Sequence, residues 1–242
     1  MNKYFEGLSD ITNYVEEHQE PVITEIDGHK YTNKSLHRVT KPEREALSVS
    51  SLSALVNYIH SNVDAHKGAF IVVIDNVLKV SVWEAIDVAT KQRELLIVAR
   101  GDHYSPEFGS YKELDRFIIE LRSRFVPTDH SSLVLSALGN LKKDESIHVN
   151  DDGITQRVTA KQGVSYETET LPNPVTLKPF RTFAEIEQPE SEFVLRINDG
   201  LRALLEEADG GVWKLVAMKR ITEFLEEALS DEIAEGNVVI LA

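Results

Sequence analysis

The sequence contains no cysteine. This absence excludes disulfide bonds, thiolate metal sites and a cysteine nucleophile, because each of them needs a thiol. The chain also lacks an apolar run of about 18 residues, the length that a membrane-spanning helix needs. Its longest apolar run, residues 69–74, has the length of a strand. The first 20 residues lack the apolar core of a signal peptide, so we expect an intracellular protein with no membrane partner.

Positive charge is scarce. The chain has 26 Lys and Arg against 40 Asp and Glu, a net charge of −14, and residues 145–242 hold 9 of these bases and 19 of these acids. An acidic surface repels phosphates at long range, so we expect no non-specific binding to duplex nucleic acid. The simplest interpretation of the acidity is solubility; the sharper one is mimicry of nucleic acid.

The first 144 residues mix helical and strand patterns. A 3.6-residue apolar period predicts helices, and alternating or continuous apolar runs predict strands. The continuous run of residues 69–75 is typical of a strand covered on both faces. Asp27-Gly28 predicts a hairpin turn, Ser48 or Ser50 could cap the second helix, and Ser110 with Glu113 matches a capping box for the third. The expected helices are residues 3–18, 50–63, 110–127 and 131–141, and the expected strands are residues 22–26, 29–32, 69–75, 77–83 and 93–100.

From Glu145 the apolar period changes from 3.6 to 2. Three alternating segments within residues 146–170 predict an antiparallel meander. Residues 171–197 hold four of the eight prolines, which predicts strands that are broken and redirected. Strands near residues 192–198, 201–207, 212–216 and 237–241 and a helix over residues 217–229 complete the pattern.

These patterns predict an α+β fold. We expect an N-terminal helix-and-sheet region, residues 1–144, followed by a mainly antiparallel β region, residues 145–242, with one late helix.

The best candidate for catalysis is the loop of residues 101–109. Asp102, His103, Tyr104 and Glu107 place carboxylates, an imidazole and a phenol within six residues. Such groups can serve general acid and base catalysis, which makes Asp102, His103 and Glu107 the candidate catalytic residues. The alternative is a polar connection that packs onto the following helix. The spacing matches no metal-ligand pattern, so we expect no metal and no cofactor.

Other short motifs lack the context that their chemistry needs. Asp129-His130 precedes two serines, but the sequence has no GxSxG elbow. Asp209-Gly210-Gly211 lacks the surroundings of a phosphate-binding loop and indicates a turn. The chain is therefore more consistent with a protein that is not an enzyme, and the question of an enzyme stays open.

A second candidate site lies in the proline-rich stretch. Lys178, Arg181 and Arg196 alternate with Phe180 and Phe183. Aromatic rings interleaved with arginine on a sheet can stack a base or a nucleotide, so these five residues are the candidate ligand-binding set. The alternative is a strand with its aromatic side chains inward and its basic side chains outward.

Three segments of the sequence resemble known proteins. The segments SLSALVNYIHSNVD, GSYKELDRFIIELRSRFVP and ITQRVTAKQGVSYETETLPNPVTLKPFRTFAEIEQPESEFVLRI resemble a group of phage and prophage proteins of unknown function. More distantly, they are similar to the YfdQ-like phage family. The resemblance spans residues 48–230 and implies a bacteriophage or prophage origin and expression in the cytoplasm of a bacterial host. It implies no catalytic residue.

Three functional hypotheses follow. The first is a non-enzymatic phage accessory protein, a binding or scaffolding module that self-associates and binds a host or phage protein. The second is an inhibitor of host anti-phage defence that sequesters a small signalling nucleotide or blocks a nuclease with its acidic surface. The third is a hydrolase that uses the 101–109 loop.

Overall fold

The computed structural model describes residues 11–15, 20–26, 29–34, 45–88, 91–102, 105–141, 147–151, 156–162, 165–170 and 173–242. The chain forms two compact units, Met1–Glu43 and Arg44–Ala242. In the first unit, residues 11–15 are helical, and strands β1 (Ile23–Ile26) and β2 (His29–Thr32) form the predicted hairpin. Asp27-Gly28, the predicted turn, lies outside the described residues.

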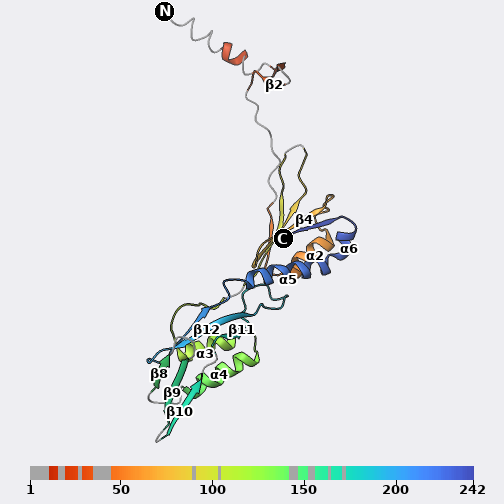
Figure 1. Cartoon of the computed structure of the whole chain (residues 1–242). Coiled ribbons are helices and arrows are strands. Elements are labelled where there is room, and N and C mark those ends of the chain that lie inside the picture. The colour runs from red at the N-terminus through yellow and green to blue at the C-terminus, as the bar shows by residue number, and fades with distance from the viewer. Residues whose placement is uncertain are drawn as a thin grey trace, which may run out of the picture. The chain divides into compact units, whose positions relative to one another are not determined.

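The second unit contains a five-stranded sheet in the order β14-β4-β5-β6-β3 (Figure 1). The two edge strands run parallel to their neighbours, and the three central strands are antiparallel. The central strands match the predicted apolar runs within one or two residues at most of their ends. The bounds are β3 Leu47–Val49, β4 Phe70–Asn76, β5 Lys79–Glu84, β6 Leu95–Arg100 and β14 Val238–Leu241.

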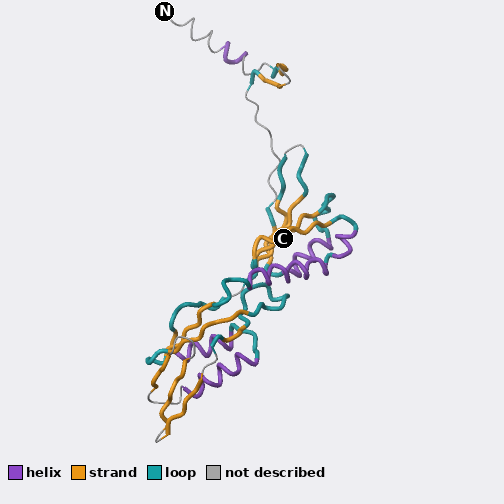
Figure 2. The backbone as a smooth tube through the Cα atoms, in the orientation of Figure 1, coloured by secondary structure: helices purple, strands orange, loops and turns teal. Residues whose placement is uncertain are grey.

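Two helices cover one face of this sheet. Helix α2 (Leu52–Ser61) and helix α5 (Trp213–Ala228) place apolar side chains against Val72, Val80 and Val82 of the central strands. The short helix α6 (Ser230–Ala234) connects α5 to β14. Figures 1 and 2 show α2, α5 and α6 on the same side of the strands. A first apolar core therefore lies between these helices and one face of the sheet.

A second core lies around a four-stranded sheet in the order β11-β12-β13-β7. Its strands are antiparallel, and two helices pack on it through Phe117, Leu121 and Leu138. The strand bounds are β7 Lys112–Glu113, β11 Val175–Leu177, β12 Ser191–Ile197 and β13 Arg202–Glu207, and the helices are α3 Leu114–Ser123 and α4 Asp129–Leu141.

The predicted meander is present as a separate three-stranded antiparallel sheet in the order β10-β9-β8. Its strands are β8 (Ile147–Asp151), β9 (Gln156–Gln162) and β10 (Ser165–Thr170). With helices and mostly antiparallel sheets in one unit, the α+β fold class is confirmed.

Several expected helix starts differ from the structure. Ser51 rather than Ser48 or Ser50 caps α2, since its side chain accepts from the Ala54 N–H. Helix α3 begins at Leu114 without a side-chain cap, because Lys112–Glu113 pair with β13 instead of forming a capping box. Helix α5 begins at Trp213, so the strand expected over residues 212–216 is wrong.

The grouping of the chain also differs from the predicted boundary at residue 144. Strand β7 joins the sheet of β11–β13, and β14 joins the sheet of β3–β6, so both large sheets combine residues from before and after this position. The division of the chain into two compact units falls between residues 43 and 44. The predicted boundary itself lies among residues 142–146, which are outside the described residues.

The proline-rich stretch links the two cores. Val175 and Leu177 lie in the second core, Phe183 and Ile186 lie in the first, and Phe193 returns to the second. Gln188 is 4% exposed and closes the loop between them: its amide oxygen accepts from the Arg181 and Thr182 N–H groups at 3.0 and 3.2 Å. The prolines redirect the backbone so that one short segment serves both cores.

Candidate functional site

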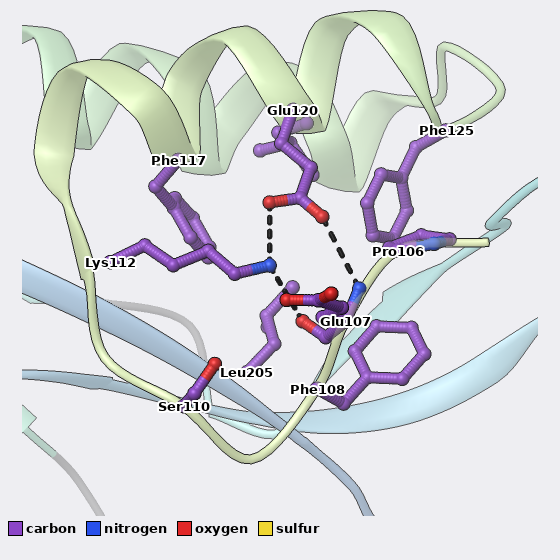
Figure 3. Close-up of a pocket in the computed structure, with 10 residues that line it drawn as sticks. Pro106, Glu107, Phe108, Ser110, Lys112, Phe117, Glu120, Phe125 and Leu205 are labelled. Carbon is purple, nitrogen blue, oxygen red and sulfur yellow. Dashed lines mark hydrogen bonds and ion pairs between the residues drawn. The ribbon is translucent and has the colours of Figure 1, made fainter. Parts of the chain in front are cut away.

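The 101–109 loop does not gather its candidate residues in one place. His103 and Tyr104 lie outside the described residues. Asp102 lines an open groove of about 520 Å³, whereas Glu107 lines a different recess of about 10 Å³ (Figure 3). The described part of the loop therefore provides two separated carboxylates rather than a pair of neighbouring acids and bases.

Glu107 takes part in its recess mainly through its backbone. Its N–H donates to Glu120 Oε1 at 3.3 Å, and its carbonyl oxygen accepts from Lys112 Nζ at 2.8 Å. The Glu120 carboxylate is 8% exposed and also accepts from Lys112 Nζ at 2.6 Å and from Arg124 Nη1 at 3.1 Å. Phe108, Phe117 and Phe125 surround this network in Figure 3. A recess of this size holds about one water molecule, which is too little space for a substrate. The hydrogen bonds and ion pairs of the network anchor the loop to α3.

The groove at Asp102 lies where β3 and β6 end and α2 begins. Its polar lining comprises Ser48, Ser50, Ser51, Arg100 and Asp102. Parallel strands that end beside a helix N-terminus often bind anions. Here an internal carboxylate already uses that helix end, since the Ser53 N–H donates to Glu185 Oε1 at 3.1 Å. The groove therefore has polar groups of both signs and no single charge preference.

The five candidate ligand-binding residues do not form one surface. Phe183 is 1% exposed in the first core, and Arg181 is 3% exposed between side-chain partners. Lys178 pairs with Glu187 at 2.8 Å and with Glu190 at 3.3 Å, and its pKa is raised chiefly by the hydrogen bond to Glu187.

The two remaining members of the candidate set are half-buried in separate parts of the second sheet region. Phe180 follows Pro179, and its N–H donates to the Arg124 carbonyl oxygen at 2.9 Å. Arg196 lies on β12 opposite Leu204 of β13. Both residues are therefore held by backbone pairing, at positions apart from the buried Arg181 and Phe183.

Arg181 is the centre of a buried cluster that the alternating pattern did not predict. Its Nη1 lies 2.5 Å from Glu207 Oε1, its Nη2 donates to Ser191 Oγ, and its Cζ lies 3.8 Å from the centre of the Trp213 ring. Burial lowers the pKa of Arg181 to about 10, opposed by the negative charges of Glu207 and Asp209. The guanidinium stays charged at neutral pH and joins the loop, β13 and the start of α5.

Asp209 completes this cluster at the start of α5. Its Oδ2 accepts from Ser191 Oγ at 2.5 Å, and its Oδ1 accepts from the Gly211 N–H at 3.0 Å. Burial raises the pKa of Asp209, but the hydrogen bonds from Ser191 and Gly211 and the charge of Arg181 outweigh it, so the net pKa is lowered. The polar groups of this cluster bond to one another, so the cluster links the loop, β12 and the start of α5.

The feature that is open to a partner is the second face of the five-stranded sheet. The register places Ile71, Val73, Trp83, Val239 and Leu241 on the face opposite the helices. We call these five residues the open sheet face. They are absent from the first core, and Val239 and Leu241 are 47% and 51% exposed. Ser81 and Val98 lie on the same face and are 0% and 5% exposed, so the face is most open along β14. No described helix of the second unit packs on this face in Figures 1 and 2.

A chain of hydrogen bonds orders the middle of the open sheet face. Trp83 Nε1 donates to Ser81 Oγ at 2.9 Å, and Ser81 Oγ donates to Asp75 Oδ2 at 2.7 Å. Asp75 Oδ1 pairs with Lys79 Nζ at 3.2 Å. These bonds hold the indole over the fully buried Ser81, so a rigid aromatic side chain is presented among aliphatic ones. Rigid aromatic side chains are frequent anchors in protein interfaces.

Sequence reasoning missed the open sheet face because it located strands but not their neighbours. The run of residues 69–75 indicated a strand covered on both faces, whereas Ile71 and Val73 are only half-buried. Among the described residues, no group of three or more His, Asp or Glu is arranged to hold a metal ion, and no helix has the length and apolarity to cross a membrane.

Comparison of the chain with family models, with curated proteins and with solved structures finds no match. The resemblance to phage and prophage proteins therefore stays an expectation.

Proposed function

We propose that this protein is a non-enzymatic bacteriophage or prophage accessory protein, a binding module whose open sheet face contacts another protein in the host cytoplasm. The observation that carries the proposal is the five-stranded sheet with helices on one face only. A sheet normally buries both faces when its strands are apolar on both, so the exposed and half-buried side chains of the face without helices are available to a partner.

The chemistry of the open sheet face supports protein binding over catalysis. Its side chains are aliphatic apart from Trp83, and the polar atoms beside them are paired with each other. Apolar and aromatic side chains together with paired polar groups are common in protein interfaces. The described residues of the 101–109 loop contribute nothing to this face: Asp102 and Glu107 lie in their own recesses.

A pull-down from infected bacterial lysate tests the proposal. The bait proteins are wild type, the variant Val73→Glu on the open sheet face, and Leu133→Glu, a control at a side chain that is 60% exposed on α4. We expect wild type and Leu133→Glu to retain a protein that Val73→Glu loses. Retention of the same proteins by all three would overturn the proposal. So would turnover of a substrate that depends on the 101–109 loop.

A further inference from the structure

Strand β14 is an edge strand of the five-stranded sheet. It pairs with β4 alone, so the backbone N–H and C=O groups that point away from β4 lack a strand partner among the described residues. Its four residues are Val238, Val239, Ile240 and Leu241. Such an edge is a template for an added strand, which gains one row of hydrogen bonds and contact with alternate side chains.

Three other edge strands of the second unit have features that discourage pairing. The Thr176 N–H of edge strand β11 donates to His130 Nδ1 at 3.3 Å, and prolines stand close to both ends of that strand. Edge strand β10 has two glutamates among its six residues. Strand β3 is three residues long. Strand β14 has no charge and no proline, so its sequence does not discourage pairing.

The surroundings of β14 are acidic. After Arg220 the chain has no Lys or Arg, and its acids are Glu223, Glu226, Glu227, Asp231, Glu232 and Glu235. The last two lie at the start of β14, because Asn237 N–H donates to the Glu232 carbonyl oxygen at 2.8 Å and Asn237 Nδ2 donates to Glu235 Oε2 at 2.9 Å. A basic segment is therefore attracted to this edge, whereas a second copy would bring the same acids together.

We propose that the β14 edge binds an extended segment of a partner protein, apolar at alternate positions and carrying Lys or Arg, as an added antiparallel strand. The inference rests on the proposed function, because the added strand extends the open sheet face through Val239 and Leu241. Apolar side chains of the segment contact these two residues, and its basic side chains lie beside α6. The antiparallel direction gives the better hydrogen-bond geometry.

The test uses the full chain and a labelled peptide probe of alternating lysine and valine, with an alternating glutamate and valine peptide as control. Fluorescence anisotropy measures both at low and at high salt. We expect the basic peptide to bind at least tenfold more tightly than the acidic one and to weaken as salt rises. In protein labelled with nitrogen-15, amide signals of Val239 and Leu241 shift on binding. Equal binding of both peptides, or none, would overturn the inference.

Matched variants locate the contact. Val239→Lys with Leu241→Lys adds two charges at exposed positions of the edge, and Leu133→Lys with Ser136→Lys adds two at exposed positions of α4. We expect the edge variant to lose at least tenfold in affinity for the basic peptide and the α4 variant to keep it. Circular dichroism confirms that each variant is folded.

The outcomes separate this inference from the proposed function. If no peptide binds but Val73→Glu still loses the lysate protein, the edge inference fails and the proposed function stands. If sedimentation shows a wild-type dimer that the edge variant loses, the edge belongs to a second copy, and the inference is again overturned.

Discussion

The guanidinium of Arg181 lies 3.8 Å from the centre of the Trp213 ring. The contact joins the proline-rich stretch to the first turn of α5, and the ion pair with Glu207 joins both to β13. Arg181 was predicted as a residue that binds a ligand, because arginine alternates with aromatic residues in this stretch. In the structure its aromatic partner is distant in sequence, and its charge is paired inside the protein.

We predict that Arg181→Ala lowers the free energy of unfolding by about 1–3 kcal/mol, because it removes the buried guanidinium that bonds to Ser191 and pairs with Glu207. Urea unfolding followed by tryptophan fluorescence measures the change. Arg202→Ala is the matched control: Arg202 pairs with Glu113 at 3.1 Å on the surface, with both side chains largely exposed, so we expect a loss of about 1 kcal/mol or less. Equal losses for the two variants would show that the Arg181 cluster has no special role.

The Asp209 carboxylate predicts a pH dependence. Its pKa is lowered in the folded protein, so the unfolded chain takes up a proton first as the pH falls below the ordinary value of 3.8. The stabilisation by Asp209 is therefore complete above this value and is lost as the pH falls through the folded pKa. In Asp209→Asn we expect a smaller dependence of stability on pH in this acidic range, measured by thermal unfolding. An unchanged dependence would contradict the assignment.

Gln188 is predicted to fix the loop between the cores. Replacement by methionine keeps the approximate length but removes the acceptor for the Arg181 and Thr182 N–H groups. Each buried N–H without a partner costs about 1–3 kcal/mol, so Gln188→Met should lower the free energy of unfolding by several kcal/mol. Hydrogen exchange at the Arg181 and Thr182 amides should increase in parallel. Slow exchange at both amides in the variant would show that another acceptor holds the loop.

Lys112 is predicted to stabilise the 101–109 loop through Glu120. In Lys112→Met the Glu120 carboxylate keeps its ion pair with Arg124 but loses the closer one, with Lys112 Nζ at 2.6 Å. We expect a loss of about 3 kcal/mol in unfolding free energy, typical of a buried pair with one partner removed. The double variant Lys112→Met with Glu120→Gln should recover part of this loss. A double variant that is no more stable than Lys112→Met would contradict the pairing.

The sequence predicted the positions of strands and helices better than it predicted which strands pair. Period and turn residues located β4, β5, β6 and the meander, because these strands follow one another and pair locally. The pairing of β14 with β4 joins segments more than 160 residues apart, and no local pattern carries that information. The same limit applied to Lys112, where pairing with β13 replaced the expected helix start.

The candidate residues show the same limit. In β12 the Phe and Arg alternation of the proline-rich stretch holds in part, since Phe193 is fully buried and Arg196 is half-buried. It could not show that Phe183 enters the first core or that Arg181 meets Trp213, since both contacts depend on how the loop folds. The open sheet face is defined by what does not pack on it, which a sequence pattern does not reveal.

The central claim is that the open sheet face binds a partner protein. The most direct measurement places a photo-crosslinking residue at Val73, and in a matched protein at Leu133, and irradiates each in infected bacterial lysate. Mass spectrometry identifies the adducts. The account predicts a discrete adduct from position 73 that is absent from position 133. Adducts of the same identity and yield from both positions, or from position 133 alone, would contradict it.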